Sequence, residues 1–273
     1  MSETARARSE ALSPLLAPDE PPPFEAVNAA AKEPVLFVCD HASARIPRAL
    51  GTLGLGEVDR GRHIACDIGA AAVTRALIAR FDVRGMLANY SRLVIDLNRA
   101  PGDPTLIPVI SDGTIIPGNR GLSPQAAAQR VETLFHPYHA AITAVMTEMR
   151  EREPMPALIS IHSFTPTYKG ELRPWHVGVL WDENGGLALP FIEGLRTVPG
   201  ICVGDNQPYS GRDHYAYTVD FHARQAGLPE LAIEIRQDLV GSDAGAAEWA
   251  EIVGDVLAPI LADVAHHHAA RKR

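Results

Sequence analysis

Short apolar runs that end in polar residues recur along the chain. Val35–Cys39 is a continuous apolar run with β-branched residues, and Leu93–Leu97, Ala157–Ile161 and Leu231–Ile233 follow the same design. Runs of this kind are typical of buried strands in a parallel sheet. Polar residues stand in or directly after them: Asp40 with His41, Asp96 with Asn98 and Arg99, His162, and Glu234 with Arg236. Because ligands of open α/β sheets bind at the carboxyl ends of the strands, we expect the functional site there.

Stretches with helical spacing separate these runs. Ser123 followed by Pro124 predicts the start of a helix, and apolar residues continue at helical spacing as far as Met149. A second amphipathic stretch covers about residues 69–81, and a third begins at Ser242. Strands and helices that alternate without a repeat period predict a single α/β domain over residues 34–265.

Both ends of the chain differ from this pattern. Residues 1–33 mix Ser, Glu, Arg and Ala and then become proline-rich, which predicts a flexible leader laid loosely on the domain. Residues 266–273 are expected to form a frayed basic tail whose histidines, His266 to His268, are solvated.

The segment 204–221 is rich in polar and aromatic residues and is expected to be a long loop. Loops of this composition often line a binding site. Arg212 and His214 are its candidate substrate contacts, and a packed surface loop is the alternative. His136 and His139, on the predicted helix, are interpreted as structural.

Composition narrows the classes of function. The chain has 273 residues, 46% of them hydrophobic, which is enough for a substantial core. Lys+Arg 25 against Asp+Glu 33 gives 25 − 33 = −8, which argues against nucleic acid or an anionic membrane as the main partner. Three scattered cysteines predict neither a disulfide framework nor a thiolate zinc site. With no secretory signal and no membrane span in the sequence, the expected location is the cytoplasm.

His41 and His162 are the first candidates for chemistry, because both stand at the ends of apolar runs. Neutral imidazole is a good zinc ligand, and catalytic zinc usually takes three protein ligands and leaves one position for water. The alternative is that each is a hydrogen-bonded histidine at a strand end.

Glu234 is an acid inside an apolar strand, so it must be paired, protonated or functional. Beside a metal-bound water, a carboxylate whose pKa is raised by burial is a suitable general base. The alternative is an ion pair with Arg236 or Arg99.

Arginines stand at both ends of the predicted strand 93–97. Arg92 and Arg99, with Asn98 beside the latter, could hold a substrate carboxylate through two parallel hydrogen bonds. The alternative is a structural salt bridge from Asp96. Together with Arg212 and Arg236, these residues predict a locally basic crevice in an acidic protein.

Four ordered segments then carry a resemblance: 40–47 (DHASARIP), 91–99 (SRLVIDLNR), 160–164 (SIHSF) and 227–239 (GLPELAIEIRQDL). Together they resemble the N-formylglutamate amidohydrolase family over about residues 34–262. The family is similar in fold to zinc carboxypeptidases and aspartoacylase. The resemblance therefore implies a three-layer domain with a mixed, largely parallel sheet, one catalytic zinc ion and a role in histidine catabolism.

The resemblance also implies roles for single residues. His41 and His162 correspond to metal ligands, Asn98 and Arg99 to the groups that bind the substrate carboxylate, and Glu234 to the base. In the wider superfamily a glutamate follows the first histidine by three positions, where this chain has Ala44. Asp67 is the candidate replacement ligand, with a helix N-cap as its alternative role, and His63 is a weaker substitute.

The preferred hypothesis is zinc-assisted hydrolysis of an N-acyl, preferably N-formyl, acidic amino acid, with Glu234 and His162 as catalytic residues. A carboxypeptidase-like or other N-acyl amino acid hydrolase would use the same residues. A carboxylate-binding protein without zinc is a third hypothesis, because Ala44 removes the usual carboxylate ligand. The oligomeric state is not predicted.

Overall fold

The computed structural model describes residues 12–271, except 154, 184, 214 and 215, and side chains as far as residue 262. Its strands are β1 (Phe24–Val27), β2 (Val35–Cys39), β3 (Arg84–Ala88), β4 (Ile110–Ser111), β5 (Thr114–Ile115), β6 (Ala157–Phe164), β7 (Thr167–Tyr168), β8 (Glu171–Leu172), β9 (Val177–Leu180), β10 (Val203–Asp205) and β11 (Glu230–Arg236). Its α-helices are α1 (Glu57–Arg60), α2 (Ala70–Phe81), α3 (Pro124–Arg130), α4 (His136–Arg152), α5 (Ala188–Arg196), α6 (Tyr217–His222), α7 (Gln237–Val240) and α8 (Asp243–Arg271). The remaining turns are η1 (Arg48–Leu50), η2 (Pro117–Asn119), η3 (Val131–Phe135), η4 (Gly211–Asp213) and η5 (Arg224–Ala226).

In the described part of the chain, seven strands form one mixed sheet in the order β1-β3-β2-β6-β11-β9-β10. Strands β3, β2, β6 and β11 run parallel, whereas β1 is antiparallel to β3 and β9 is antiparallel to β11. From β2 the chain continues to β3 on one side, and from β6 it continues to β9 on the other. The neighbouring strands β2 and β6 therefore flank a reversal of strand order, which is where open α/β sheets form their ligand crevice.

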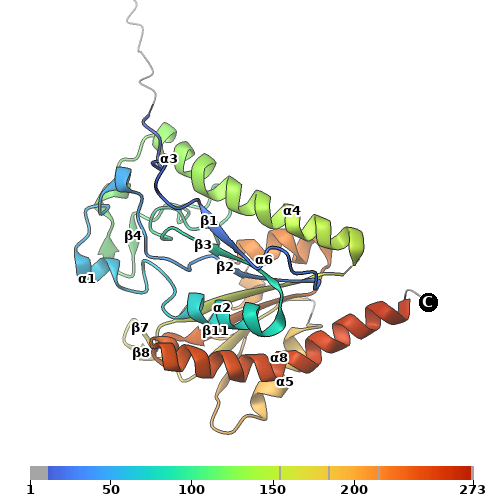
Figure 1. The fold of residues 1–273 in the computed structure, drawn as a ribbon. Helices are drawn as coiled ribbons and strands as arrows, with labels where there is room; N and C mark the ends of the chain where they lie inside the picture. The colour runs from blue at the N-terminus through green and yellow to red at the C-terminus, as the bar shows by residue number, and fades with distance from the viewer. Residues whose placement is uncertain (1–11, 154, 184, 214–215, 272–273) are drawn as a thin grey trace, which may run out of the picture.

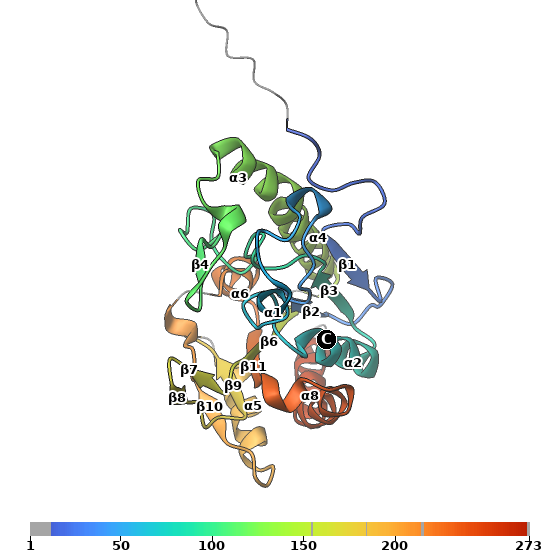
Figure 2. The same ribbon diagram turned by 90° about the vertical axis from the view of Figure 1, so that its left-hand side faces the viewer.

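Helices cover both faces of this sheet and make three layers (Figures 1 and 2). Helices α2, α5 and α8 lie on one face and α3, α4 and α6 on the other. In β2, Phe37 packs with the first layer while Leu36 and Val38 pack with the second. A central strand buried on both faces needs apolar residues at every position, which explains why the continuous apolar runs predicted these strands.

Most of the predicted elements are confirmed. Three of the four apolar runs form β2, β6 and β11, and the predicted helices appear as α2, α3 with α4, and α8. Ser123 caps α3, because its Oγ accepts a hydrogen bond from the Ala126 amide at 3.2 Å. A π-helical turn, η3, joins α3 to α4. Within the described residues, no helix has both the length and the apolar character needed to cross a bilayer.

The run Leu93–Leu97 is not a strand, which corrects the prediction. It forms a series of buried turns, and the strand next to β2 is instead β3, whose Gly85 interrupts the apolar pattern. The carbonyls of Leu93 and Val94 accept hydrogen bonds from the side chains of Asn119 and Arg130. An apolar run indicates that a segment is buried. Whether the segment is a strand or a series of turns depends on which groups bond to its backbone, here the side chains of Asn119 and Arg130.

Three segments that we expected to lack regular structure contain elements. Residues 24–27, within the predicted leader, form β1 at the edge of the sheet. The segment 204–221 includes the end of β10, η4 and most of α6. Helix α8 continues through residue 271, into the predicted tail, where the side chains of His266 to His268 lie outside the described part.

Candidate active site

A cavity of about 710 Å³ opens at the carboxyl ends of the central strands. His41 is the second residue after β2, while His162 and Glu234 belong to the neighbouring strands β6 and β11, where they occupy paired positions. Seven predicted site residues line this cavity: His41, Asp67, Arg92, Asn98, Arg99, His162 and Glu234. The fold therefore brings together residues that are up to 193 positions apart in the sequence (234 − 41 = 193).

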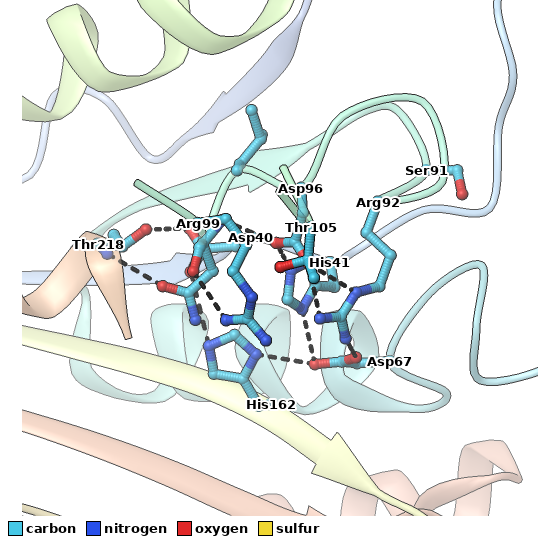
Figure 3. Close-up of polar contacts among 12 residues, drawn as sticks. Asp40, His41, Asp67, Ser91, Arg92, Asp96, Arg99, Thr105, His162 and Thr218 are labelled. Carbon is cyan, nitrogen blue, oxygen red and sulfur yellow. Dashed lines mark hydrogen bonds and ion pairs between the residues drawn. The ribbon is translucent and has the colours of Figure 1, made fainter. Parts of the chain in front are cut away.

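His41, Asp67 and His162 form a buried group whose ligand atoms all lie within 4.8 Å of one another. Asp67 Oδ2 is 3.2 Å from His41 Nδ1 and 2.8 Å from His162 Nδ1 (Figure 3). Two imidazole nitrogens and one carboxylate oxygen that converge in this way are a suitable ligand set for zinc. Asp67 thus lies between the two histidines and contributes the carboxylate oxygen of this group.

The loop before α2 positions Asp67. The Asp67 amide donates to the His41 carbonyl at 3.0 Å, which ties this loop to the end of β2. The N-cap of α2 is Gly69, so Asp67 does not cap the helix. Gly69 has a φ of 81°, and a Cβ there would lie 2.2 Å from the Val240 carbonyl oxygen. Only glycine suits this turn, which directs Asp67 towards the two histidines.

The second ring nitrogen of each histidine also has a partner. His41 Nε2 is 2.7 Å from Asp96 Oδ1, and His162 Nε2 is 2.9 Å from Ser160 Oγ. Asp40 Oδ2 lies 3.5 Å from the same nitrogen of His162. Hydrogen bonds of this kind fix the orientation and tautomer of metal-binding histidines. The residues present therefore fit a metal site in both their ligand atoms and the supporting contacts.

Charges around the group favour a cation at its centre. Burial would raise the pKa of Asp67, but the neighbouring histidines hold that pKa far below its usual range. Burial likewise opposes protonation of His162, yet Asp40 and Asp67 raise its pKa well above the ordinary value. The site thus favours positive charge next to Asp67, and a proton or a metal ion can provide it.

Arg92 joins two of the carboxylates. Its Nη2 is 2.7 Å from Asp96 Oδ2, and its Nη1 is 3.4 Å from Asp67 Oδ1. The structural salt bridge considered for Asp96 is therefore present. Burial raises the pKa of Asp96, but Arg92 and His41 hold it well below its usual value. In this arrangement Arg92 supports the His–Asp–His group, and its contact with a substrate stays a prediction.

Glu234 is buried beside His162, and its Oε2 has no hydrogen-bond partner among the described residues. Burial raises the pKa of Glu234 to about 7, although the adjacent His162 acts in the opposite direction. The expected alternative partner Arg236 pairs with Asp238 instead, with Nε 2.8 Å from Oδ1. A carboxyl group with a pKa near neutrality can accept and return a proton.

Asn98 and Arg99 reach the cavity from the loop after Asp96. Asn98 Oδ1 accepts a hydrogen bond from the Thr218 amide at 3.0 Å, and the Thr218 hydroxyl donates to Asp40 at 3.0 Å. Arg99 Nη1 donates to the Asn98 carbonyl at 3.1 Å. This side of the cavity can bind an anionic group such as a carboxylate.

Two predicted contacts lie away from the cavity lining. Arg212 lies over the Trp181 ring, 5.4 Å from its centroid, and Arg236 contacts Asp238 and the carbonyls of residues 173–175. His214 lies outside the described residues, so its contact stays a prediction. His63 does line the cavity, but its Nε2 is 3.4 Å from Asp112 and it does not join the His–Asp–His group.

Sequence reasoning missed three polar residues that support the site, Asp40, Ser160 and Thr218, and one that lines the cavity, Tyr209. Asp40 and Ser160 are each within two positions of a predicted histidine, and this proximity was the only available signal. Thr218 and Tyr209 come from the segment 204–221, where only two candidates were chosen. No spacing pattern in the sequence assigns a role to any of these four residues, so their roles become visible only in the structure.

The strand order, the crevice and the His–Asp–His group beside a buried carboxyl define an α/β protein with the layout of a hydrolase. The family model of N-formylglutamate amidohydrolase matches residues 33–240. The chain belongs to this family and is therefore an amidohydrolase, as the resemblance predicted.

Two solved structures share the fold of the chain. A gene product of Agrobacterium tumefaciens is 35% identical, with a TM-score of 0.87, and the match covers 92% of this chain and 99% of that one. N-formylglutamate amidohydrolase from Ralstonia eutropha JMP134 is 21% identical, with a TM-score of 0.69 and coverage of 90% and 99%, and shows the same fold. No protein of curated function matches the chain significantly.

Proposed function

We propose that this amidohydrolase cleaves the amide bond of an N-formyl amino acid that carries an acidic side chain, in the manner of N-formyl-L-glutamate, with the help of one zinc ion. The buried group of His41, Asp67 and His162, with Glu234 beside it, is the observation that carries this proposal. The name of the Ralstonia enzyme supports the choice of the formyl group and of glutamate.

His41, Asp67 and His162 would hold the metal. When bound, zinc acts as a Lewis acid that polarises a carbonyl and lowers the pKa of water. Asp96 keeps His41 oriented, Ser160 keeps His162 oriented, and Arg92 keeps Asp67 in place. These contacts fix the ligand set before the substrate arrives, so that little reorganisation is needed during the reaction.

Glu234 would serve as the general base and then as the general acid. It takes a proton from the attacking water, whose oxygen bonds to the formyl carbon. It then returns the proton to the amine nitrogen as the C–N bond breaks, so that the products are formate and the free amino acid. A pKa of about 7 suits both transfers near neutral pH.

Arg99 and Asn98 would hold a carboxylate of the substrate and thereby place the formyl group next to the His–Asp–His group. Positioning of this kind converts binding energy into a higher rate at the reacting bond. The third hypothesis, a carboxylate-binding protein without zinc, rested on Ala44, and Asp67 now supplies a carboxylate in the ligand group.

Elemental analysis combined with a substrate panel tests the proposal. The panel contains N-formyl-L-glutamate, N-acetyl-L-glutamate, N-formyl-L-alanine and a peptide with a C-terminal glutamate. We expect about one zinc ion per chain and fastest hydrolysis of N-formyl-L-glutamate. Preference for the peptide would favour a carboxypeptidase-like activity, and zinc-loaded enzyme that leaves the whole panel intact would contradict the proposal.

A further inference from the structure

Loop 91–99 carries four residues of the site, Arg92, Asp96, Asn98 and Arg99, although it belongs to no strand. Several of its amides donate to backbone carbonyls of the loop itself or of the segment after it. The Val94 amide donates to the Ser91 carbonyl at 2.9 Å, and the Asp96 amide donates to the Leu106 carbonyl at 2.7 Å. Buried carbonyls also need partners, and in a sheet a neighbouring strand would provide them. Here the side chains of Asn119, Arg130 and His139 provide them instead.

Asn119, at the end of η2, and Arg130, at the end of α3, hold the first half of the loop. Asn119 Nδ2 donates to the Leu93 carbonyl at 2.8 Å, and Arg130 Nη1 donates to the Val94 carbonyl at 2.8 Å. The same Arg130 nitrogen donates to Asn119 Oδ1 at 2.7 Å. Because arginine can only donate, this contact also fixes which way the Asn119 amide faces.

Arg130 is unusual because the residue is only 1% exposed and its guanidinium donates to neutral oxygens, those of Val94, Asn119 and Gly118. Burial lowers its pKa to about 10. A buried charge is normally paired, and an apolar residue would avoid the desolvation cost. An apolar residue would also leave the Val94 carbonyl buried without a donor. The contact with the loop is therefore the feature that accounts for an arginine here.

His139, on α4, holds the second half of the loop. Its Nε2 is 2.9 Å from the Leu97 carbonyl, and its Nδ1 is 2.9 Å from His222 Nε2. A carbonyl only accepts, so His139 Nε2 carries the proton and the neutral ring accepts from His222 at Nδ1. His222 Nδ1 in turn lies 3.3 Å from the Thr143 hydroxyl. The chain of donors runs from Thr143 through both histidines to the loop.

We propose that Asn119, Arg130 and His139 are positioning residues that hold loop 91–99 in its active shape. Asn119 and Arg130 act on the part that carries Arg92 and Asp96, and so on the ligand group. His139 acts on the part that carries Asn98 and Arg99, and so on substrate binding. The separate effects on the ligand group and on substrate binding rest on the proposed function. The effect of these residues on the shape of the loop does not.

Arg130→Met tests the first half of the loop, with Arg84→Met as a matched control. Arg84 is also buried and donates to a carbonyl, that of Ala31 at 2.8 Å, but it contacts Glu148 and lies away from the loop. Amide hydrogen exchange of residues 91–99 and the affinity for Zn²⁺, measured by competition with a chelator, are the readouts. Neither of them requires a substrate.

In Arg130→Met we expect exchange in residues 91–99 to accelerate and Zn²⁺ affinity to fall by about tenfold, the lower end of losses for outer contacts of a metal site. Arg84→Met should lower global stability without either change. The inference is overturned if both variants behave alike. Should Arg130→Met not fold, Arg130→Lys, which retains one donor nitrogen, must show the same localised change to a smaller degree.

His139 provides an independent test of the second half. In His139→Leu we expect KM for N-formyl-L-glutamate to rise about tenfold at nearly unchanged kcat, because a lost hydrogen bond of ordinary strength costs about 1 kcal/mol or slightly more. In His139→Gln the side-chain amide can donate to the Leu97 carbonyl and should restore most of KM. Equal KM values in the two variants would contradict this role.

The two proposals fail in different ways. Wild-type enzyme that does not hydrolyse N-formyl-L-glutamate contradicts the proposed function, and the exchange pattern of residues 91–99 then still decides the positioning roles. Active wild-type enzyme with unchanged exchange in both Arg130→Met and His139→Leu contradicts the positioning roles alone.

Discussion

His162 and Arg99 line the same cavity, but the protein holds them by different means. The strand that carries His162, β6, is paired with β2 on one side and β11 on the other. Arg99 belongs to loop 91–99, where side chains of Asn119, Arg130 and His139 replace the missing strand partners. The residues on or next to the strands (the sheet side) are thus held by backbone hydrogen bonds, which any sequence that forms these strands would make. The residues of loop 91–99 (the loop side) are held by three particular side chains.

This difference has a functional counterpart. The sheet side contributes His41, His162 and Glu234, which would hold the metal and move the proton. The loop side contributes Asn98 and Arg99, which would recognise the substrate, while Arg92 and Asp96 of the same loop connect the two sides. Changes on the sheet side should therefore abolish chemistry, and changes on the loop side should alter binding.

The largest effect is expected from His162→Ala, which removes a ligand on the sheet side. Zinc affinity should fall by more than about 100-fold, since even the loss of outer contacts costs about 10- to 100-fold. Hydrolysis should drop to the level of enzyme stripped of metal by a chelator. His136→Ala is the control, because this histidine is exposed on α4, forms an ion pair with Glu132 and does not line the cavity. Zinc retained in His162→Ala would exclude the assigned ligand set.

Glu234→Gln should lower kcat by about 10²- to 10⁴-fold, because the amide cannot accept the proton from water. Zinc content should remain unchanged, since Glu234 is not part of the ligand group. Steady-state kinetics with metal analysis of the same sample would check both. A variant that has lost its zinc together with its activity would point to Glu234 as a ligand instead.

Arg99→Met tests the loop side. If Arg99 holds a carboxylate, KM for N-formyl-L-glutamate should rise by about 10- to 100-fold, in line with about 1.5–3 kcal/mol for a hydrogen bond to a charged group. kcat should change much less. The ratio of kcat/KM between this substrate and its α-amide derivative, compared in wild type and variant, would show whether the α-carboxylate is the recognised group. The derivative with an amide in place of the side-chain carboxylate is compared in the same way. If both ratios are the same in wild type and variant, Arg99 does not bind a carboxylate of the substrate.

The smallest effect is expected on acid stability. Burial lowers the pKa of His139 to about 4, below the ordinary value of about 6.5 in an unfolded chain. The unfolded state therefore binds the proton first as the pH falls, so that stability decreases below about pH 6.5. At pH 5 the loss from this residue amounts to about 2 kcal/mol.

Urea unfolding at pH 7.5 and pH 5 would measure this contribution. In His139→Gln the difference in the free energy of unfolding between the two pH values should be smaller than in wild type by about that amount. An identical pH dependence in both proteins would show that His139 is not held neutral by the fold.

The candidate site was predicted more completely than its support. His41, His162 and Glu234 follow from apolar runs that end in polar residues, because a strand buried on both faces leaves a recognisable pattern. Asp67 was a candidate ligand, and the structure places it between the two histidines. By contrast, Arg212 is predicted from the composition of its loop and Arg236 from its place at a strand end, and neither signal encodes the direction of a side chain.

The sequence by itself determined the α/β class, the central strands β2, β6 and β11, the helices that cover them, and the residues at the strand ends, because burial periodicity and short polar motifs are local properties. Only the tertiary structure decided that Leu93–Leu97 is a turn, that residues 24–27 join the sheet as β1, and that Asp67 completes a group with two distant histidines. These outcomes depend on partners far away in the chain, such as Arg130 for the Val94 carbonyl and Val240 against Gly69. A hydrogen bond or a close contact between distant segments leaves no periodic signal in either of them.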